Sequence, residues 1–261
     1  MDLIQALIVG AVQGILEWLP VSSSGQGMLI LINFLQANPQ AAFSLSIFLH
    51  MGTLLAVLVK YRDELLRLLL NLRWEDPLLR FLIITTMATG IIGVPAYMLL
   101  KGFISGAQGM AANALVGLLL VFTGIALHYS SKKAGSKKMG GIGYPEMAAA
   151  GVAQGIAILP GISRSGTTIA SLLLMGVEQR LALKLSFLMS IPAVLGALAL
   201  DFASGDMAAS GFGVQEMAAG VFAAFVFGYF TMDFMLKAAG KMRFDLFCIA
   251  FGLLAVLSLI I

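Results

Sequence analysis

Apolar segments long enough to cross a lipid bilayer dominate the sequence. Residues 81–100 read FLIITTMATGIIGVPAYMLL and contain no charged residue, and a transmembrane helix needs about 20 mostly apolar residues. Comparable segments occupy residues 42–60, 111–130, 185–200, 217–236 and 244–261. Only 11% of the chain is charged and 60% is hydrophobic, whereas a soluble domain carries about 25% charged residues. The sequence therefore predicts an all-α polytopic membrane protein with six full transmembrane helices.

Two further apolar stretches are interrupted by polar residues near their middle. Residues 3–36 and 146–176 each contain a proline and a cluster of serines and glycines, residues that end helices and form turns. Each stretch is expected to form two short helices that meet at a turn. Irregular backbone at membrane depth is tolerated where protein buries it or where it lines a wet cavity. We interpret both stretches as re-entrant helical hairpins, although two full spans each would give the same sidedness.

The two interrupted stretches resemble each other. Residues 10–25 read GAVQGILEWLPVSSSG and residues 151–166 read GVAQGIAILPGISRSG. At one offset of 141 positions the second segment matches Gly10, Gln13, Gly14, Ser22, Ser24 and Gly25 of the first. The match indicates a duplication, with repeat 1 over residues 1–130, a basic cytoplasmic linker over 131–145 and repeat 2 over 146–261. Because three full spans separate the hairpins, repeat 2 should be inverted in the membrane relative to repeat 1.

The positions of the basic residues agree with this topology. If the first hairpin enters from outside, 14 of the 16 Lys and Arg residues fall in cytoplasmic segments, as the positive-inside rule requires. They are Lys60, Arg62, Arg67, Arg73, Arg80, Lys132, Lys133, Lys137, Lys138, Arg180, Lys184, Lys237, Lys241 and Arg243. Both termini then lie outside, and the pI of about 9.1 reflects short loops rather than a nucleic-acid surface. Residues 60–80 are expected to form one amphipathic helix on the inner membrane surface.

Polar side chains within the two hairpins are the candidates for function, since polar groups at membrane depth are costly. Gln13 and Glu17 are four residues apart and share one face of a helix. Arg164 lies among hydroxyl residues beside Gly166, and a guanidinium with hydroxyls and free N–H groups at a helix start suits a phosphate. Both turns begin a new helix, so the two helix dipoles favour an anion between them.

Simpler structural roles are open for the same residues. Gln13 and Gln154 could be interhelical hydrogen-bond partners, and single serines could serve close packing. Arg164 could pair with Glu17 as a purely structural bridge. The single cysteine, Cys248, excludes an internal disulfide and a thiolate zinc site.

The motifs VQGILEWLPVSSSGQ and LPGISRSGTT resemble the signatures of the undecaprenyl-diphosphatase family, also called the bacitracin-resistance or BacA family. The similarity covers the whole chain. The resemblance implies an undecaprenyl-diphosphate phosphatase in which Glu17, Ser23 and Arg164 are catalytic, with Ser23 as the nucleophile. It also implies that Glu17 binds a divalent cation, Mg²⁺ or Ca²⁺. The substrate-binding residues would then be Gln13, Ser22, Ser24, Gln26, Ser163, Ser165, Gly166 and Thr168.

One position departs from the pattern of that family. The family usually follows the serines with Gly-His, and this chain has Gly25-Gln26. Glutamine can neither titrate nor form a phosphoenzyme, so a mechanism that depends on this histidine would need another residue. If Ser23 is the nucleophile, Gln26 could still hydrogen-bond a phosphate oxygen. His50, on the first full span, is a conceivable replacement for the missing imidazole.

The resemblance implies that a polyisoprenyl diphosphate such as undecaprenyl diphosphate is hydrolysed to the monophosphate and phosphate. This reaction would recycle a lipid carrier for cell-envelope and peptidoglycan synthesis, at a site open to the outer face of the plasma or inner membrane. The main alternative is a polyisoprenyl-phosphate flippase that uses the same pocket without hydrolysis, and a scaffold without a ligand is a third. The expected partners are the lipid substrate and the bilayer, with no nucleic acid; a homodimer is left open.

Overall fold

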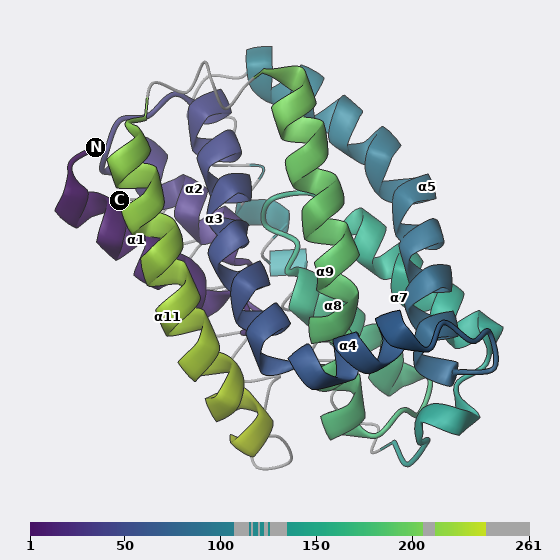
Figure 1. The fold of residues 1–261 in the computed structure, drawn as a ribbon. Helices are drawn as coiled ribbons and strands as arrows, with labels where there is room; N and C mark the ends of the chain where they lie inside the picture. The colour runs from purple at the N-terminus through teal and green to yellow at the C-terminus, as the bar shows by residue number, and fades with distance from the viewer. Residues whose placement is uncertain are drawn as a thin grey trace.

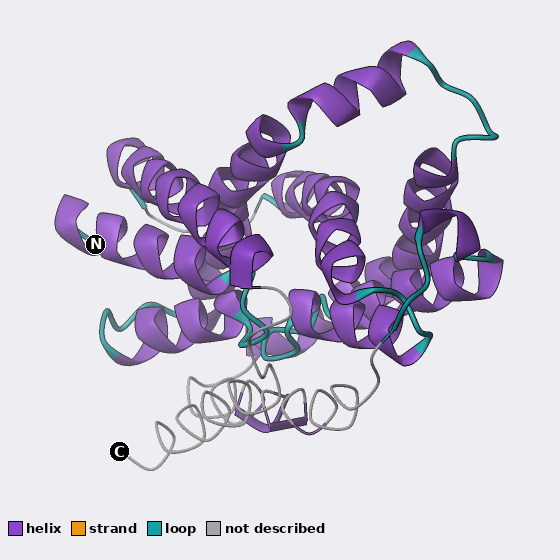
Figure 2. Ribbon diagram, turned by 90° about the horizontal axis from the view of Figure 1, so that it is seen from below, coloured by secondary structure: helices purple, strands orange, loops and turns teal. Residues whose placement is uncertain are grey.

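A computed structural model gives the fold of the chain and describes residues 1–106, 115, 117–119, 121–122, 125, 135–205 and 212–238. Within these residues the regular secondary structure is helical (Figure 2), and pairing of extended backbone is limited to one bridge between Lys137 and Val177. The predicted all-helical class is therefore confirmed. The expected span at 244–261 and most of the span at 111–130 lie outside the described residues. So do four of the basic residues assigned to the cytoplasmic side: Lys132, Lys133, Lys241 and Arg243.

Four described helices are long and apolar enough to cross a membrane. They are α3 (Pro39–Lys60), α5 (Pro77–Gly106), α9 (Gln179–Ser204) and α11 (Val214–Ala238). They correspond to four of the six expected spans, and each begins earlier than the sequence suggested. In α3 a polar capping group sets the start of the helix, because the Asn38 side chain accepts a hydrogen bond from the N–H of Ala41 at 2.7 Å.

Each interrupted stretch forms two short helices, as predicted. The first stretch gives α1 (Leu3–Leu16) and α2 (Ser23–Asn33), and the second gives α7 (Tyr144–Ile156) and α8 (Arg164–Leu174). A proline lies in each break, where its ring prevents the helix from continuing. After each break a serine at the same repeat position, Ser22 or Ser163, caps the next helix. Its hydroxyl accepts the N–H of the glycine three residues on, at 3.3 Å in α2 and 3.1 Å in α8.

The amphipathic segment at 60–80 is shorter than predicted. Helix α4 covers only Arg62–Leu70 and lies across the ends of the long helices (Figure 1). The chain then turns before α5, because Asp76 Oδ1 accepts the N–H groups of Leu78 and Leu79 at 2.8 and 3.3 Å. A side chain that bonds the backbone in this way competes with a continuous helix. The prediction of one helix over 60–80 was therefore wrong.

The order of helices repeats along the chain, and the two halves pack reciprocally. Helices α7 and α8 begin 141 residues after α1 and α2, and a short 3-10 turn, η1 (Met139–Gly141), precedes α7. Helix α1 lies against α11, and its counterpart α7 lies against α5 (Figure 1). Repeated glycines permit both contacts. A Cβ atom at Gly10 would lie 2.1 Å from the oxygen of Gly220, and one at Gly151 would lie 2.6 Å from the oxygen of Thr85.

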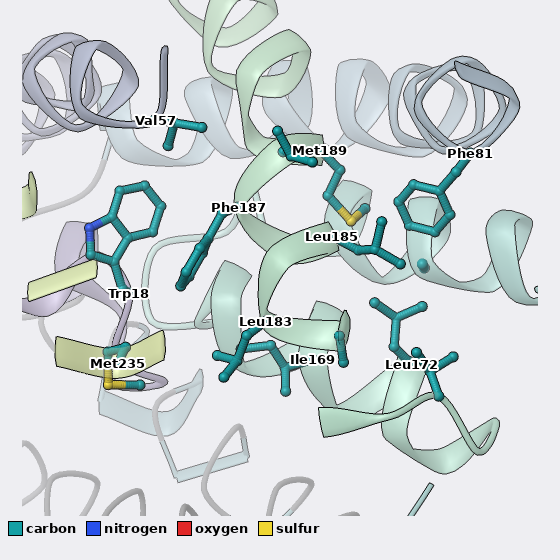
Figure 3. Packing of buried hydrophobic residues seen from close by; sticks show 14 of the residues in the cluster. Trp18, Val57, Phe81, Ile169, Leu172, Leu183, Leu185, Phe187, Met189 and Met235 are labelled. Carbon is teal, nitrogen blue, oxygen red and sulfur yellow. The ribbon is translucent and has the colours of Figure 1, made fainter. Parts of the chain in front are cut away.

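A buried aromatic pair fixes the first break to the second half of the chain. Trp18 is almost fully buried and meets Phe187 of α9 edge to face, with ring centroids 4.9 Å apart (Figure 3). Its indole Nε1–H donates to the carbonyl of Gly228 in α11 at 2.8 Å. Aromatic rings contribute the largest buried areas in a core. This packing therefore holds Trp18, the residue that follows Glu17, in one position.

Candidate active site

The two helix breaks contact each other directly. The N–H of Gly161 donates to Ser22 Oγ at 3.0 Å, and Ser165 Oγ donates to the carbonyl of Leu19 at 3.0 Å. Ser22 has a φ of 57°, a left-handed conformation that costs a non-glycine residue about 1–2 kcal/mol. Its hydrogen bonds from both halves hold it there. The serine-rich turn and the arginine-bearing turn therefore form one unit, as the sequence analysis predicted.

A single carboxylate, Glu17, gathers the polar groups of both halves. Its side chain is buried, with 4% of the residue exposed. Its Oε2 accepts hydrogen bonds from Gln13 Nε2 at 2.8 Å and Ser23 Oγ at 2.6 Å, and its Oε1 pairs with the guanidinium of Arg164. The structure thus brings together all three residues that the resemblance implied as catalytic. A serine hydroxyl whose proton points at a carboxylate has the geometry of a nucleophile beside its base.

Two further contacts hold the side chain of Arg164, the arginine of this site. Arg164 is the first residue of α8, and its Nη1 donates to the carbonyl of Ser186 at 3.0 Å. Its guanidinium carbon lies 5.6 Å from the centre of the Trp18 ring, a cation–π distance. A guanidinium has five N–H donors, so these contacts orient it and leave donors for an anion.

A cavity of about 470 Å³ adjoins these groups, a size typical of small-molecule sites. The breaks supply six polar residues of its lining: Glu17, Ser22, Ser23, Ser24, Ser163 and Arg164. Further polar residues come from α3, α5 and α7: Ser46, His50, Thr86, Thr89 and Gln154. Helices α5 and α9 supply mainly apolar and small side chains, among them Gly90, Gly93, Val94, Pro192 and Leu200. The cavity therefore combines an anion-binding end with an apolar wall, which suits a phosphate carried on an apolar chain.

Five of the residues proposed to bind substrate do not line this cavity: Gln13, Gln26, Ser165, Gly166 and Thr168. Gln13 instead donates a hydrogen bond to Glu17 Oε2. Thr168 shares a hydrogen bond with the hydroxyl of Ser186 at 2.7 Å, next to the carbonyl that holds Arg164. Gln26 is half-exposed, and its backbone N–H continues helix α2 by donating to the carbonyl of Ser22 at 3.0 Å. These residues shape the site from outside it.

The structure places an imidazole in the site, at His50 of α3. The side chain lines the cavity, its Nε2 lies 3.2 Å from Glu17 Oε2, and its Nδ1 lies 2.6 Å from the carbonyl of Ser46. The sequence analysis named His50 only as a conceivable replacement for the missing motif histidine. In the sequence, His50 stood out only because it is an ionisable residue within an apolar span. The residues near it in the chain do not show that this face of α3 is directed at Glu17.

Gln154 is a lining residue that the sequence analysis assigned to no site. Its Nε2 donates to Thr89 Oγ1 and to the carbonyl of Met189, both at 3.1 Å. These bonds tie α7 to α5 and α9, as the interhelical alternative predicted. Its Oε1 is buried without a hydrogen-bond partner among the described residues, so one acceptor remains available at the cavity.

The donor set at Glu17 does not fit a resident divalent cation. No group of three or more His, Cys, Asp or Glu side chains comes together within the described part of the chain. Both oxygens of Glu17 already have partners, and one of these is the cationic Arg164. Mg²⁺ and Ca²⁺ prefer several oxygen ligands, which these residues do not supply. The expectation of a metal held by Glu17 therefore gains no support from the geometry.

Fold and site together define a helical integral membrane protein with an anion-receptive cavity where two broken helices meet. Comparison with known sequences places the chain within that class. The model of the family described as "Bacitracin resistance protein BacA" matches residues 6–257, and the chain belongs to this family.

Proteins named "Undecaprenyl-diphosphatase" are similar to the chain over nearly their whole length. The protein of Methanothrix thermoacetophila is 46% identical, with 97% of this chain and 96% of the relative covered. The protein of Methanococcoides burtonii is 38% identical, with 99% of each chain covered. The protein of the bacterium Carboxydothermus hydrogenoformans is 36% identical, with 100% of this chain and 98% of the relative covered.

Proposed function

We propose that this protein is a membrane-embedded phosphatase that hydrolyses a polyisoprenyl diphosphate, such as undecaprenyl diphosphate, to the monophosphate and inorganic phosphate. The observation that carries the proposal is the contact of Ser23, Glu17 and Arg164 at one end of a cavity with apolar walls. The names of the relatives point to the same reaction. The product is the lipid carrier that cell-envelope synthesis consumes.

The first chemical step is an attack by Ser23 on the terminal phosphorus. Glu17 Oε2, 2.6 Å from Ser23 Oγ, accepts the serine proton as the bond from oxygen to phosphorus forms. The bond from the terminal phosphorus to the bridging oxygen breaks, and the lipid monophosphate leaves. Arg164 turns its guanidinium from Glu17 towards the phosphoryl oxygens and stabilises the charge that builds up on them. Water then releases phosphate from Ser23.

The helix starts at the two breaks supply the remaining anion binding. Helices α2 and α8 begin at the cavity, so the positive ends of two helix dipoles face the diphosphate. The hydroxyls of Ser24 and Ser163 line the same end and can donate to phosphate oxygens.

The membrane arrangement that fits this function is a pair of re-entrant hairpins in inverted repeats. Helix α1 has 14 residues and is about 21 Å long, shorter than the bilayer core of about 30 Å. The reciprocal contacts of α1 with α11 and of α7 with α5 agree with a pseudo-twofold axis in the membrane plane. With both termini outside, the cavity would receive the diphosphate from the outer leaflet while its isoprenyl tail stays in lipid.

Phosphate release by the purified protein tests this proposal. The full chain in detergent micelles should release inorganic phosphate from undecaprenyl diphosphate, and mass spectrometry after an acid quench should find phosphate on Ser23. The variant Ser23→Ala should release none. Ser24→Ala is the matched control, because Ser24 lines the cavity without a hydrogen bond to Glu17, and it should change kcat by less than about tenfold.

The flippase alternative makes a different prediction for the same assay. It expects binding of the lipid without release of phosphate, by the wild-type protein as well as by Ser23→Ala. The geometry favours hydrolysis, because Ser23 Oγ contacts a carboxylate that can accept its proton and both residues line the cavity. Wild-type protein that binds the lipid and releases no phosphate would overturn the proposal.

A further inference from the structure

We infer that His50 is a catalytic acid and base of this site, working opposite Glu17. This inference rests on the proposed function and adds a residue to it. The imidazole comes from α3, outside both sequence motifs, and it lines the same cavity as Ser23 and Arg164. Gln26, at the position where the family pattern expects a histidine, does not line that cavity.

Hydrogen bonding fixes both the orientation of the His50 ring and its tautomer. A carbonyl oxygen can only accept, so the 2.6 Å contact between Nδ1 and the carbonyl of Ser46 requires a proton on Nδ1. The ring is thereby held with Nε2 directed at Glu17 Oε2, 3.2 Å away. A carboxylate oxygen and a bare ring nitrogen would repel each other there, so a proton lies between them. This proton is additional to the one that Ser23 donates to the same oxygen.

The resting site therefore holds two protons that can move, and the reaction needs two. Ser23 must lose one as it attacks, and the bridging oxygen of the diphosphate gains one as the lipid monophosphate leaves. Glu17 is suited to the first task because Ser23 Oγ touches it. His50 is suited to the second because its ring lines the cavity and is anchored through Nδ1 by the carbonyl of Ser46. Its Nε2–H is released from Glu17 Oε2 when that oxygen takes the proton of Ser23.

The atoms and protons balance over both steps. In the first, Ser23 Oγ bonds to the terminal phosphorus and gives its proton to Glu17, while the bond to the bridging oxygen breaks and His50 protonates that oxygen. In the second, a water oxygen attacks the same phosphorus and gives a proton to the now neutral His50. The bond from phosphorus to Ser23 Oγ breaks, and Oγ takes its proton back from Glu17. Both side chains return to their starting states.

Steady-state kinetics of two His50 variants test the inference. His50→Gln can still donate a hydrogen bond towards Glu17 but cannot carry a proton, so a purely structural role predicts near-normal activity. We expect kcat for phosphate release from undecaprenyl diphosphate to fall by about 10²–10⁴-fold, the usual contribution of general acid–base catalysis, with KM within about threefold. His50→Ala should be equally slow, and free imidazole added to it should raise its rate but not the wild-type rate.

Binding and a neighbouring control separate chemistry from folding. His50→Gln should keep the wild-type thermal stabilisation by undecaprenyl monophosphate, and Met51→Leu on the same helix should leave kcat within about twofold. A kcat for His50→Gln within threefold of wild type would overturn the inference, and so would a loss of monophosphate binding that accounts for the lost rate. If the wild-type protein releases no phosphate, the proposed function itself fails, and this result differs from either outcome for the variants.

Discussion

The guanidinium of Arg164 pairs with the carboxylate of Glu17, although 147 residues separate them in the sequence. Each lies at the helix break of a different interrupted stretch. The pair is largely buried, with side-chain exposures of 14% and 3%, and both residues line the cavity. It therefore serves two purposes: it joins the two halves of the fold and holds the proposed base beside the cavity.

Removal of this arginine should affect stability and activity separately. Arg164→Ala removes one of the two cationic partners of the buried Glu17 and leaves His50 as the other, and breaking a buried pair from one side costs about 3–5 kcal/mol. The rate of phosphate release should fall by about 10³-fold or more, as expected for the loss of an arginine that stabilises a phosphoryl transition state. The double variant Glu17→Gln with Arg164→Gln removes both charges of the pair but leaves His50 without its carboxylate, so its thermal midpoint should recover only part of the way towards wild type while its activity stays absent. An Arg164→Ala protein with near-normal turnover would contradict the assignment.

The left-handed backbone of Ser22 gives a comparison between two substitutions. Ser22→Ala and Ser22→Gly both remove the hydroxyl that accepts the N–H groups of Gly25 and Gly161 at 3.3 and 3.0 Å. Glycine adopts a φ of 57° without the steric cost that alanine pays. Ser22→Gly should therefore be more stable than Ser22→Ala by about 1 kcal/mol, measured by thermal unfolding in detergent. The reverse order would show that the left-handed conformation is not kept.

The close packing of α1 on α11 should make Gly10 intolerant of a side chain. A Cβ atom at Gly10 would lie 2.1 Å from a backbone oxygen of Gly220, and backbone cannot move aside cheaply. Gly10→Ala should destabilise the protein by about 1–3 kcal/mol or more. Among the described residues, no atom outside its own stretch of α5 lies within 4 Å of the Cβ position of Gly102, so Gly102→Ala is the control and should be neutral or stabilising by up to about 1 kcal/mol. Equal thermal midpoints for the two variants would contradict this packing.

The start of α7 should contribute a pH-dependent part of the stability. The pKa of Glu146 lies below its ordinary value of 4.5, because Lys137 Nζ donates to Oε1 at 2.7 Å and the N–H of Gly143 donates to Oε2 at 3.0 Å. A carboxyl whose pKa is lowered by folding stabilises the folded state above its unfolded-state pKa, and this stabilisation is lost as the pH falls through the folded pKa. Glu146→Gln should therefore lower the thermal midpoint at pH 7, and its difference from wild type should shrink as the pH falls below about 4.5.

A second variant isolates the cause of that pH dependence. Lys137→Met removes the cation and leaves the hydrogen bond from Gly143 in place. The loss of thermal stability as the pH falls below about 4.5 should therefore be smaller in Lys137→Met than in the wild type. If acidification lowers the thermal midpoint of Lys137→Met as much as that of the wild type, the ion pair is not the source of the pH dependence.

Much of the architecture follows from local sequence chemistry. Pro20 and Pro160 interrupt apolar stretches, and the serines after them can cap a helix wherever the rest of the chain lies. The repeated glycines are local features too, because the absence of a side chain permits any neighbouring helix to approach closely. The error at 60–80 is also local, since the helical pattern of the leucines hid the competing cap at Asp76.

The side chains that complete the site depend on how the helices pack. A histidine in the middle of α3 and a glutamine one turn into α2 look equally able to reach a phosphate. Packing directs His50 to Glu17 and leaves Gln26 off the cavity wall. The pairing of Glu17 with Arg164 is a further example, because the guanidinium comes from the second interrupted stretch.

The sequence by itself determined the membrane class, the duplication, the two helix breaks and the polar residues at them. Each of these depends on short-range properties: apolar length, backbone restriction by proline, and capping by serine. Only the tertiary structure decided which of those polar residues share a cavity and that an imidazole from a third helix joins them. The reason is physical, because the direction of a side chain between helices is set by the contacts of its whole helix, and most of the contacts of α3 are with α9 and α11, more than a hundred positions away.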